Sequence, residues 1–156
     1  MDVVTWDTPV TTEQSASAQI GILGGQISLP NLGLTVIVPA FAVSSTTTIT
    51  VTAVPGNQVA YEFEPHGLRF NAPVVVRQSL AGTSAQQNGI IPGVLYGGYF
   101  PDVSALNQLN GTALVDEILR VSIDRVLGSA TFSILHFSGY LLGTGEAGPT
   151  GGEGTQ

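Results

Sequence analysis

Near the C-terminal end of the chain, a histidine and a serine stand two residues apart, with Phe137 between them. His136 and Ser138 lie in an apolar stretch, residues 130–142, that is typical of a β-strand. Side chains at i and i+2 of a strand share one face, so we expect the imidazole and the hydroxyl to be neighbours. A neutral imidazole can activate a serine as a nucleophile, and the nearest substrate is the chain's own Phe137–Ser138 peptide bond. The same residues are equally compatible with a packed strand that performs no chemistry.

The second histidine, His66, follows two glutamates at alternating positions. Glu62, Glu64 and His66 share one face if this segment is a strand, which suggests a metal site or an acid–base cluster. A metal site needs more ligands in a fixed geometry, so we favour a solvated strand edge followed by a Pro-His-Gly turn. Tyr61 and Phe63, on the opposite face, are expected to belong to the core.

Other patterns that carry chemistry are weaker. The adjacent carboxylates Asp116 and Glu117 point to opposite faces of a strand, which does not suit a glycosidase pair, and no calcium-binding spacing is present. Residues 110–112 match the N-glycosylation sequon, a pattern with frequent false matches. The sequence contains neither a phosphate-binding glycine loop nor a Gly-x-Ser-x-Gly motif. Cysteine is absent, which excludes disulfides and thiolate metal ligands, and we expect no cofactor and no metal.

The composition limits the kinds of molecule that the chain is expected to bind. The 156 residues are 43% hydrophobic and only 10% charged, against roughly 25% charged in an average globular protein. The formal net charge is −7 and lysine is absent, so we expect no binding to nucleic acid or to an anionic membrane surface. The sequence shows neither a signal-peptide pattern nor an apolar run long enough to span a membrane. We therefore expect protein partners or other copies of the same chain.

Apolar residues alternate with a period of two almost throughout the chain, which predicts β-strands. The clearest alternations run over residues 32–39, 47–53 and 119–124, and many of the residues between the apolar positions are threonines or serines. Proline and glycine separate these segments at turn-like positions. One short helical turn is expected within residues 103–109. Several short strands at close spacing predict an all-β fold, an antiparallel β-sandwich.

The chain divides into three parts. Residues 21–142 carry the strand pattern and are expected to form the single β-sandwich domain. Residues 1–20 are largely polar and are expected to be an N-terminal extension or linker strand, in which Trp6 docks on the chain's own sandwich or on a neighbour. Residues 143–156 are rich in glycine and are expected to form a flexible tail.

Four stretches of the sequence share the character of one known family of β-sandwiches. They read Gly-Gly-Gln-Ile-Ser-Leu-Pro (24–30), Leu-Thr-Val-Ile-Val-Pro-Ala (34–40), Thr-Thr-Thr-Ile-Thr-Val-Thr-Ala-Val-Pro (46–55) and Val-Ala-Tyr-Glu-Phe-Glu-Pro-His-Gly-Leu-Arg-Phe-Asn-Ala-Pro-Val-Val-Val (59–76). Together they resemble the ZU5 domain, the β-sandwich module of netrin receptors, ankyrins and tight-junction scaffolds. The likeness is greatest to the ZU5-like modules of bacterial surface and secreted proteins, which also tend to end in His-Phe-Ser-Gly-Tyr, as residues 136–140 do here.

The resemblance covers residues 24–80 and 130–142, with one notable departure. Phe41 stands where the family usually has a glycine in a Pro-Ala-Gly-Ala turn, which puts the positive φ of that turn in question. Members of the family act as structural or interaction modules. The resemblance therefore implies a structural or interaction β-sandwich of a larger secreted or cell-surface bacterial protein, with self-assembly as one form of that interaction.

The resemblance also implies an alternative, because some eukaryotic members cleave themselves between Phe and Ser of a His-Phe-Ser motif. The matching residues are His136, Phe137 and Ser138. In this alternative, Ser138 is deprotonated by His136 and attacks the carbonyl of Phe137, and water then hydrolyses the resulting ester. Such a single-turnover reaction requires a distorted peptide, donors for the oxyanion and a path for water. No convergent site for an external substrate is indicated.

Overall fold

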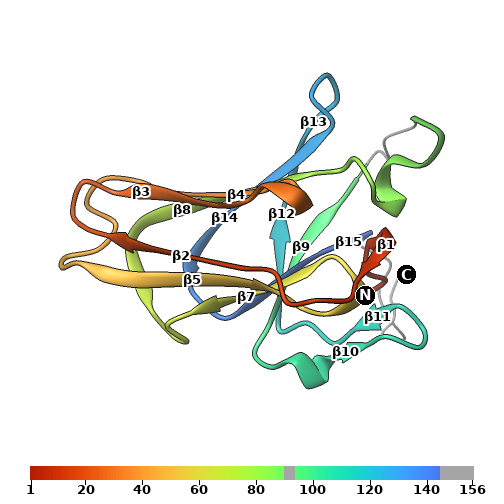
Figure 1. Ribbon diagram of the computed structural model, residues 1–156, viewed down its shortest axis with the longest axis horizontal. Coiled ribbons are helices and arrows are strands. Elements are labelled where there is room, and N and C mark those ends of the chain that lie inside the picture. Colours follow the sequence, from red (N-terminus) through yellow and green to blue (C-terminus); the bar gives the residue numbers. More distant parts are fainter. Residues whose placement is uncertain (90–93, 145–156) are drawn as a thin grey trace.

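The computed structural model describes residues 1–89 and 94–144, and within them the chain forms two large antiparallel sheets. One sheet has the strand order β12-β9-β15-β7-β5-β2 and the other the order β13-β14-β8-β4-β3. Figure 1 shows strands β3, β4, β8 and β14 lying above β2, β5 and β7, so that the two sheets form two layers. The predicted all-β, antiparallel, sandwich-like fold is confirmed.

The strands are short, as the spacing of the turns predicts. The six-stranded sheet contains β2 (Ser15–Ile20), β5 (Thr47–Ala53), β7 (Ala60–Glu64), β9 (Tyr96–Phe100), β12 (Glu117–Arg120) and β15 (Gly139–Gly143). The five-stranded sheet contains β3 (Gly25–Leu29), β4 (Leu34–Val38), β8 (Arg69–Ser79), β13 (Ser122–Asp124) and β14 (Ser129–His136). Two small pairs are β1 (Thr5–Val10) with β6 (Gly56–Gln58), and β10 (Leu106–Asn107) with β11 (Thr112–Ala113). The 3-10 helices are η1 (Pro30–Leu32), η2 (Ser84–Gly89) and η3 (Val103–Ala105).

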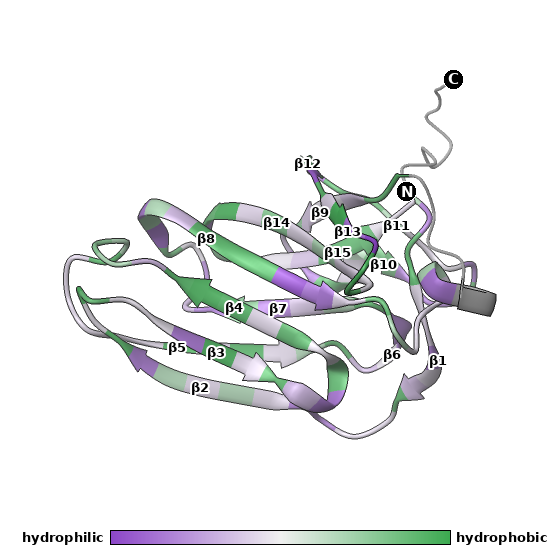
Figure 2. Ribbon diagram, turned by 90° about the horizontal axis from the view of Figure 1, so that it is seen from above, coloured by the Kyte–Doolittle hydropathy of each residue, from purple (hydrophilic) through white to green (hydrophobic). Residues whose placement is uncertain are grey.

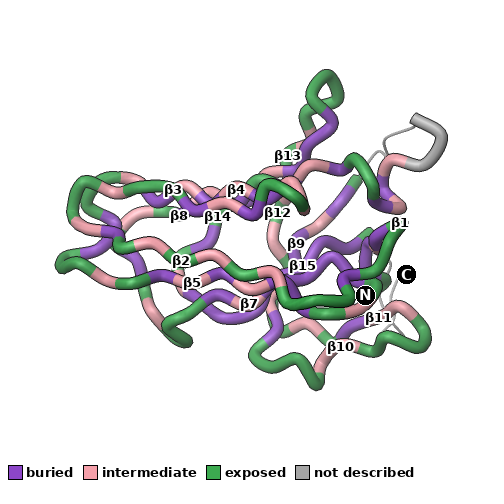
Figure 3. Tube along the Cα trace, viewed as in Figure 1, coloured by how far each residue is buried: buried purple, intermediate pink, exposed green. Residues whose placement is uncertain are grey.

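The core follows from the period-two pattern. In β5, Ile49 and Val51 are fully buried, and the threonines that alternate with them are partly or largely exposed. Val36 of β4 faces the same core from the other sheet. Figure 2 shows hydrophobic and hydrophilic residues following one another along β3, and Figure 3 shows buried residues alternating with less buried ones along the strands. Each fully buried Val or Ile side chain contributes roughly 1.5–3 kcal/mol, so this shared face holds the two sheets together.

The alternation over residues 119–124 predicts a single strand, and that prediction is wrong. β12 ends at Arg120 in the six-stranded sheet, whereas β13 begins at Ser122 in the five-stranded sheet. The chain thus changes sheets at Val121. A segment that turns the corner of a sandwich keeps its apolar side chains on the common core, so the period of two continues across the corner and hides it. The short helical turn expected within residues 103–109 is present as η3.

Residues 1–20, for which the sequence suggests an extension or linker strand, are built into the sandwich. β2 is an edge strand of the six-stranded sheet and pairs with β5 along its whole length. Trp6 of β1 is buried in the main core cluster, so it docks on the chain's own sandwich. Of the expected tail, Gly143 ends β15 and Thr144 follows it, and residues 145–156 lie outside the described part of the chain.

The turn that contains Phe41 keeps the left-handed conformation although no glycine stands there. Phe41 has φ 67°, and its N–H donates a hydrogen bond of 2.6 Å to the carbonyl of Ile22. Its ring is 68% exposed and gains little from packing. A bulky residue in this region of φ is strained, because its Cβ lies too close to its own backbone.

Candidate functional site

The apolar segment 130–142 is two strands and not one. β14 ends at His136 in the five-stranded sheet, and β15 begins at Gly139 in the six-stranded sheet. Phe137 and Ser138 form the crossing between the sheets, and the pairing of β14 with β8 shifts its register just before that crossing. The rule that residues i and i+2 share a face applies only within a strand. The expectation that His136 and Ser138 are neighbours on one strand face is therefore wrong.

His136 belongs to a different cluster. Its Nε2 lies 3.5 Å from Oε1 of Glu117, and its ring meets that of Tyr99 edge-on at 4.8 Å between centroids. The hydroxyl of Tyr140 lies 3.4 Å from Nδ1 of His136 and donates a 2.6 Å hydrogen bond to its carbonyl oxygen. Burial, followed by the negative charge of Glu117, raises the pKa of the Tyr140 hydroxyl, which therefore stays a protonated donor. The imidazole of His136 thus links β12, β9 and β15.

The partner of Ser138 is His66. Oγ of Ser138 lies 3.1 Å from Nε2 of His66, although the two residues are 72 positions apart. His66 occupies the turn between β7 and β8, as the Pro-His-Gly sequence predicts, and Gly67 supplies the positive φ of 79° that the turn requires. The histidine is exposed and the serine beneath it is buried, so the imidazole stands between the hydroxyl and solvent. Nε2 accepts the serine proton when the imidazole proton is on Nδ1.

The same turn holds the peptide bond that precedes Ser138. The N–H of Gly67 donates a 2.9 Å hydrogen bond to the carbonyl oxygen of Phe137. The N–H of Phe137 donates in turn to the carbonyl of Leu68, at 2.8 Å. On the other side, the N–H of Phe63 donates to the carbonyl of Ser138 at 2.9 Å. The β7–β8 hairpin therefore fixes the main chain of both residues that share this bond.

The Phe137 side chain anchors the crossing in the core. It is 1% exposed, and its ring contacts those of Phe63 and Phe70 at centroid distances of 5.2 and 4.7 Å. Aromatic pairs at these distances add roughly 0.5–1.5 kcal/mol each beyond their burial. Because Phe63 comes from β7 and Phe70 from β8, the ring of Phe137 packs the crossing against both strands of the hairpin.

The Ser138 hydroxyl also lies near two main-chain carbonyls. Its Oγ is 3.3 Å from the carbonyl oxygen of Phe100 and 3.4 Å from that of Pro101.

The residue after Pro101, Asp102, is exposed, and its carboxylate accepts a 2.9 Å hydrogen bond from the N–H of Ser104. The bonds from Ser104 lower the pKa of Asp102 most, and the nearby charge of His66 lowers it further. An ionised carboxylate thus lies within electrostatic range of the imidazole that contacts Ser138.

The glutamates expected to share a face with His66 do not join it. Glu64 is exposed and Glu62 is half-buried, whereas the histidine contacts Ser138. Within the described residues, no three His, Cys, Asp or Glu side chains gather closely enough to hold a metal ion. Tyr61 and Phe63 are buried in the core, as predicted.

The pairing of Ser138 with His66 was not accessible from the pattern of residues. The turn sequence Pro65-His66-Gly67 indicates only that the histidine stands at the end of a hairpin. Which crossing that hairpin faces depends on the strand order, in which β15 lies beside β7.

Among the described residues, no helix combines the length and the apolar character needed to span a membrane. The Ser138 hydroxyl thus contacts His66, and the carbonyl of Phe137 before it accepts the N–H of Gly67. A scan against models of known protein families finds no match to this chain, and a search of curated proteins finds no significant relative.

Proposed function

We propose that this chain is a self-processing β-sandwich module that cleaves its own peptide bond between Phe137 and Ser138. The observation that carries the proposal is that one turn contacts both the Ser138 hydroxyl and the Phe137 carbonyl. His66 lies 3.1 Å from the hydroxyl of Ser138, and the next residue, Gly67, donates its N–H to the carbonyl that this hydroxyl would attack. The cleaved bond is the one that the resemblance to ZU5 domains implies. The base, however, is His66 and not His136.

The first step is an N→O acyl shift. Oγ of Ser138 attacks the carbonyl carbon of Phe137, and its proton passes to Nε2 of His66. The N–H of Gly67 stabilises the negative charge that develops on the carbonyl oxygen. The bond between that carbon and the nitrogen of Ser138 then breaks, and His66 returns the proton to the leaving nitrogen. The product is an ester between residues 137 and 138 with a free amine on Ser138.

The second step is hydrolysis of that ester. A water molecule can approach from the exposed side of His66, which again acts as the base. Water adds to the ester carbonyl, the bond to Oγ of Ser138 breaks, and the serine hydroxyl is restored. Phe137 then ends in a carboxylate.

A second candidate function is a binding module that does not cleave, part of a larger secreted or cell-surface bacterial protein. Two observations favour it. The Ser138 hydroxyl lies near two carbonyl oxygens besides His66, an environment that also suits a purely structural hydrogen bond. The turn between β13 and β14 projects from the body of the molecule (Figure 1) and carries Val126 and Leu127, which are 95% and 75% exposed. Exposed apolar side chains gathered on one turn suit contact with another protein.

The intact mass of the purified chain under denaturing conditions decides between the two functions. Self-cleavage gives two species, residues 1–137 and residues 138–156, while a binding module remains one species after long incubation. Ser138→Ala removes the nucleophile and is expected to leave a single uncut chain. Two masses that persist in Ser138→Ala would show that another protease makes the cut.

A further inference from the structure

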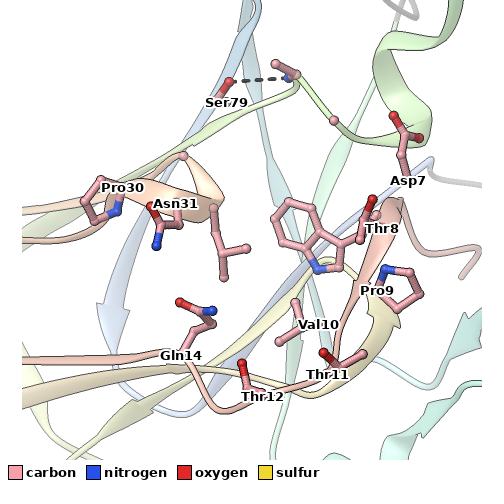
Figure 4. A pocket seen from close by; sticks show the side chains of 15 residues that line it. Asp7, Thr8, Pro9, Val10, Thr11, Thr12, Gln14, Pro30, Asn31 and Ser79 are labelled. Atoms are coloured by element: carbon pink, nitrogen blue, oxygen red, sulfur yellow. Dashed lines mark hydrogen bonds between the residues drawn. The ribbon is translucent and has the colours of Figure 1, made fainter.

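A groove lies at the end of the sandwich away from the β7–β8 turn. It encloses about 500 Å³ and is lined by three segments: β1 with the connection that leads to β2, η1 with Gly33, and the chain that follows β8. Figure 4 shows these segments surrounding the groove, with the side chains of Gln14 and Asn31 directed toward one another from opposite walls. A space of this size is typical of small-molecule sites.

The walls of the groove are held by main-chain contacts. The N–H of Asp7 donates to the carbonyl of Gly82 at 2.9 Å, and the N–H of Thr5 donates to Oγ of Ser84 at 3.0 Å. Gly33 lies so close to Ser79 that a Cβ at this position would come within 2.6 Å of the serine Cβ. The groove is therefore a built feature that joins β1 to the end of β8.

Two amide side chains of the lining are unused by the fold, whereas the Ser79 hydroxyl accepts a hydrogen bond from the N–H of Ala81. Within the described part of the chain, the side-chain amides of Gln14 and Asn31 make no hydrogen bond, and Thr11 and Thr12 add exposed hydroxyls. Each amide offers both donors and an acceptor. Among the described residues of the lining, Asp7 is the only charged one, so they offer no positive charge to hold an anion. The groove is thus suited to a neutral ligand that has many hydroxyl groups.

Trp6 supplies an independent observation at the same place. Its side chain lines the groove and is 7% exposed, and its buried indole N–H has no acceptor among the described residues. A buried N–H without an acceptor costs roughly 1–3 kcal/mol, so this wall of the groove carries an unmet hydrogen bond. Beside Trp6, Pro9 and Pro30 provide apolar surface between the polar groups.

We propose that this groove binds a neutral saccharide. Sugar hydroxyls both donate and accept, which matches the unpaired amides of Gln14 and Asn31, and the apolar C–H faces of a sugar ring match the proline and tryptophan surface. This site is separate from the Ser138–His66 pair and does not depend on self-cleavage.

The test uses the single tryptophan of the chain, whose indole N–H gives one resonance in a ¹H–¹⁵N NMR spectrum. Ser138→Ala, which keeps the chain whole, is titrated with maltotriose, cellotriose and chitotriose. We expect at least one of these trisaccharides to move the Trp6 resonance saturably, with a millimolar dissociation constant. Inorganic phosphate is expected to leave the resonance unmoved, because the lining offers it no positive charge.

Matched variants separate binding from folding. Gln14→Ala combined with Asn31→Ala is expected to weaken saccharide binding roughly tenfold or more while the thermal midpoint stays near that of the parent. Gln19→Ala, which removes an exposed amide of β2 outside the groove, is expected to bind like the parent. The proposal is overturned if none of the three trisaccharides moves the resonance, or if the double variant binds as tightly as the parent.

Discussion

His66 and His136 differ in what their imidazole rings contact. The ring of His66 reaches the Ser138 hydroxyl, whereas the ring of His136 lies against Glu117 and Tyr99. A general base must be within hydrogen-bond reach of the proton that it removes. At the scale of single residues, the proposed self-cleavage therefore takes as its base the histidine that is distant in sequence and not the one that is two positions away.

Replacing each histidine in turn tests this choice. His66→Gln removes the base and is expected to slow self-cleavage roughly a hundredfold or more, because general-base catalysis contributes at least that factor. His136→Gln, the matched control, leaves the contact between Ser138 and His66 intact and is expected to cleave at nearly the parent rate. Denaturing mass spectrometry over a time course measures both rates.

The opposite result has a clear meaning. Rapid cleavage by His66→Gln together with no cleavage by a folded His136→Gln would assign the base to His136. Circular dichroism of each variant establishes that it is folded.

At the scale of elements, turns decide where reacting groups meet. The β7–β8 turn brings its histidine and the N–H of Gly67 to the crossing between β14 and β15, because β7 pairs with β15. The turn around Phe41 shows the cost of such geometry. It keeps a positive φ although the residue there has a bulky side chain.

Phe41→Gly is expected to stabilise the protein by about 0.5–1 kcal/mol in the free energy of unfolding. The change relieves a left-handed strain of about 1–2 kcal/mol, and the greater freedom of glycine in the unfolded chain offsets part of that gain. Phe41→Ala is the matched control, since it removes the exposed ring and keeps the Cβ. Urea denaturation measures both variants. A glycine variant no more stable than the alanine variant would show that the turn carries no strain.

At the scale of the whole molecule, a cut at the crossing would disconnect β15 from the chain before it. β15 lies in the middle of its sheet. β15 pairs with β9 on one side and with β7 on the other, and Tyr140, Leu141 and Leu142 are buried. The N-terminal segment adds a hydrogen bond of 2.9 Å from the N–H of Val4 to the carbonyl of Leu142. A cut before Ser138 would leave all of these contacts in place.

The cleaved protein is therefore expected to remain one particle. The two fragments should elute together in native size-exclusion chromatography and separate only in denaturant, because each buried leucine of β15 contributes roughly 1.5–3 kcal/mol and the strand keeps its hydrogen bonds on both sides. Loss of the peptide 138–156 from the native particle would contradict this expectation. Ser138→Ala serves as the uncut reference for the elution volume.

The sequence by itself determined the fold class, most of the strands and much of the turn chemistry. The alternation in residues 47–53 marks which side chains enter the core, because side chains of a strand alternate between faces whatever sheet it joins. The Pro-His-Gly turn after β7 is likewise a local property, set by the φ preferences of proline and glycine. These features depend on residues that are near one another in the chain.

Only the tertiary structure decided which chemical groups meet. Residues 119–124 and 130–142 each read as one strand, and both change sheets, because the apolar period continues around a corner of the sandwich. The second of these corners turns His136 away and brings Ser138 to His66, 72 residues distant. Strand order is set by the packing of two sheets on one core, and no local pattern of residues records it.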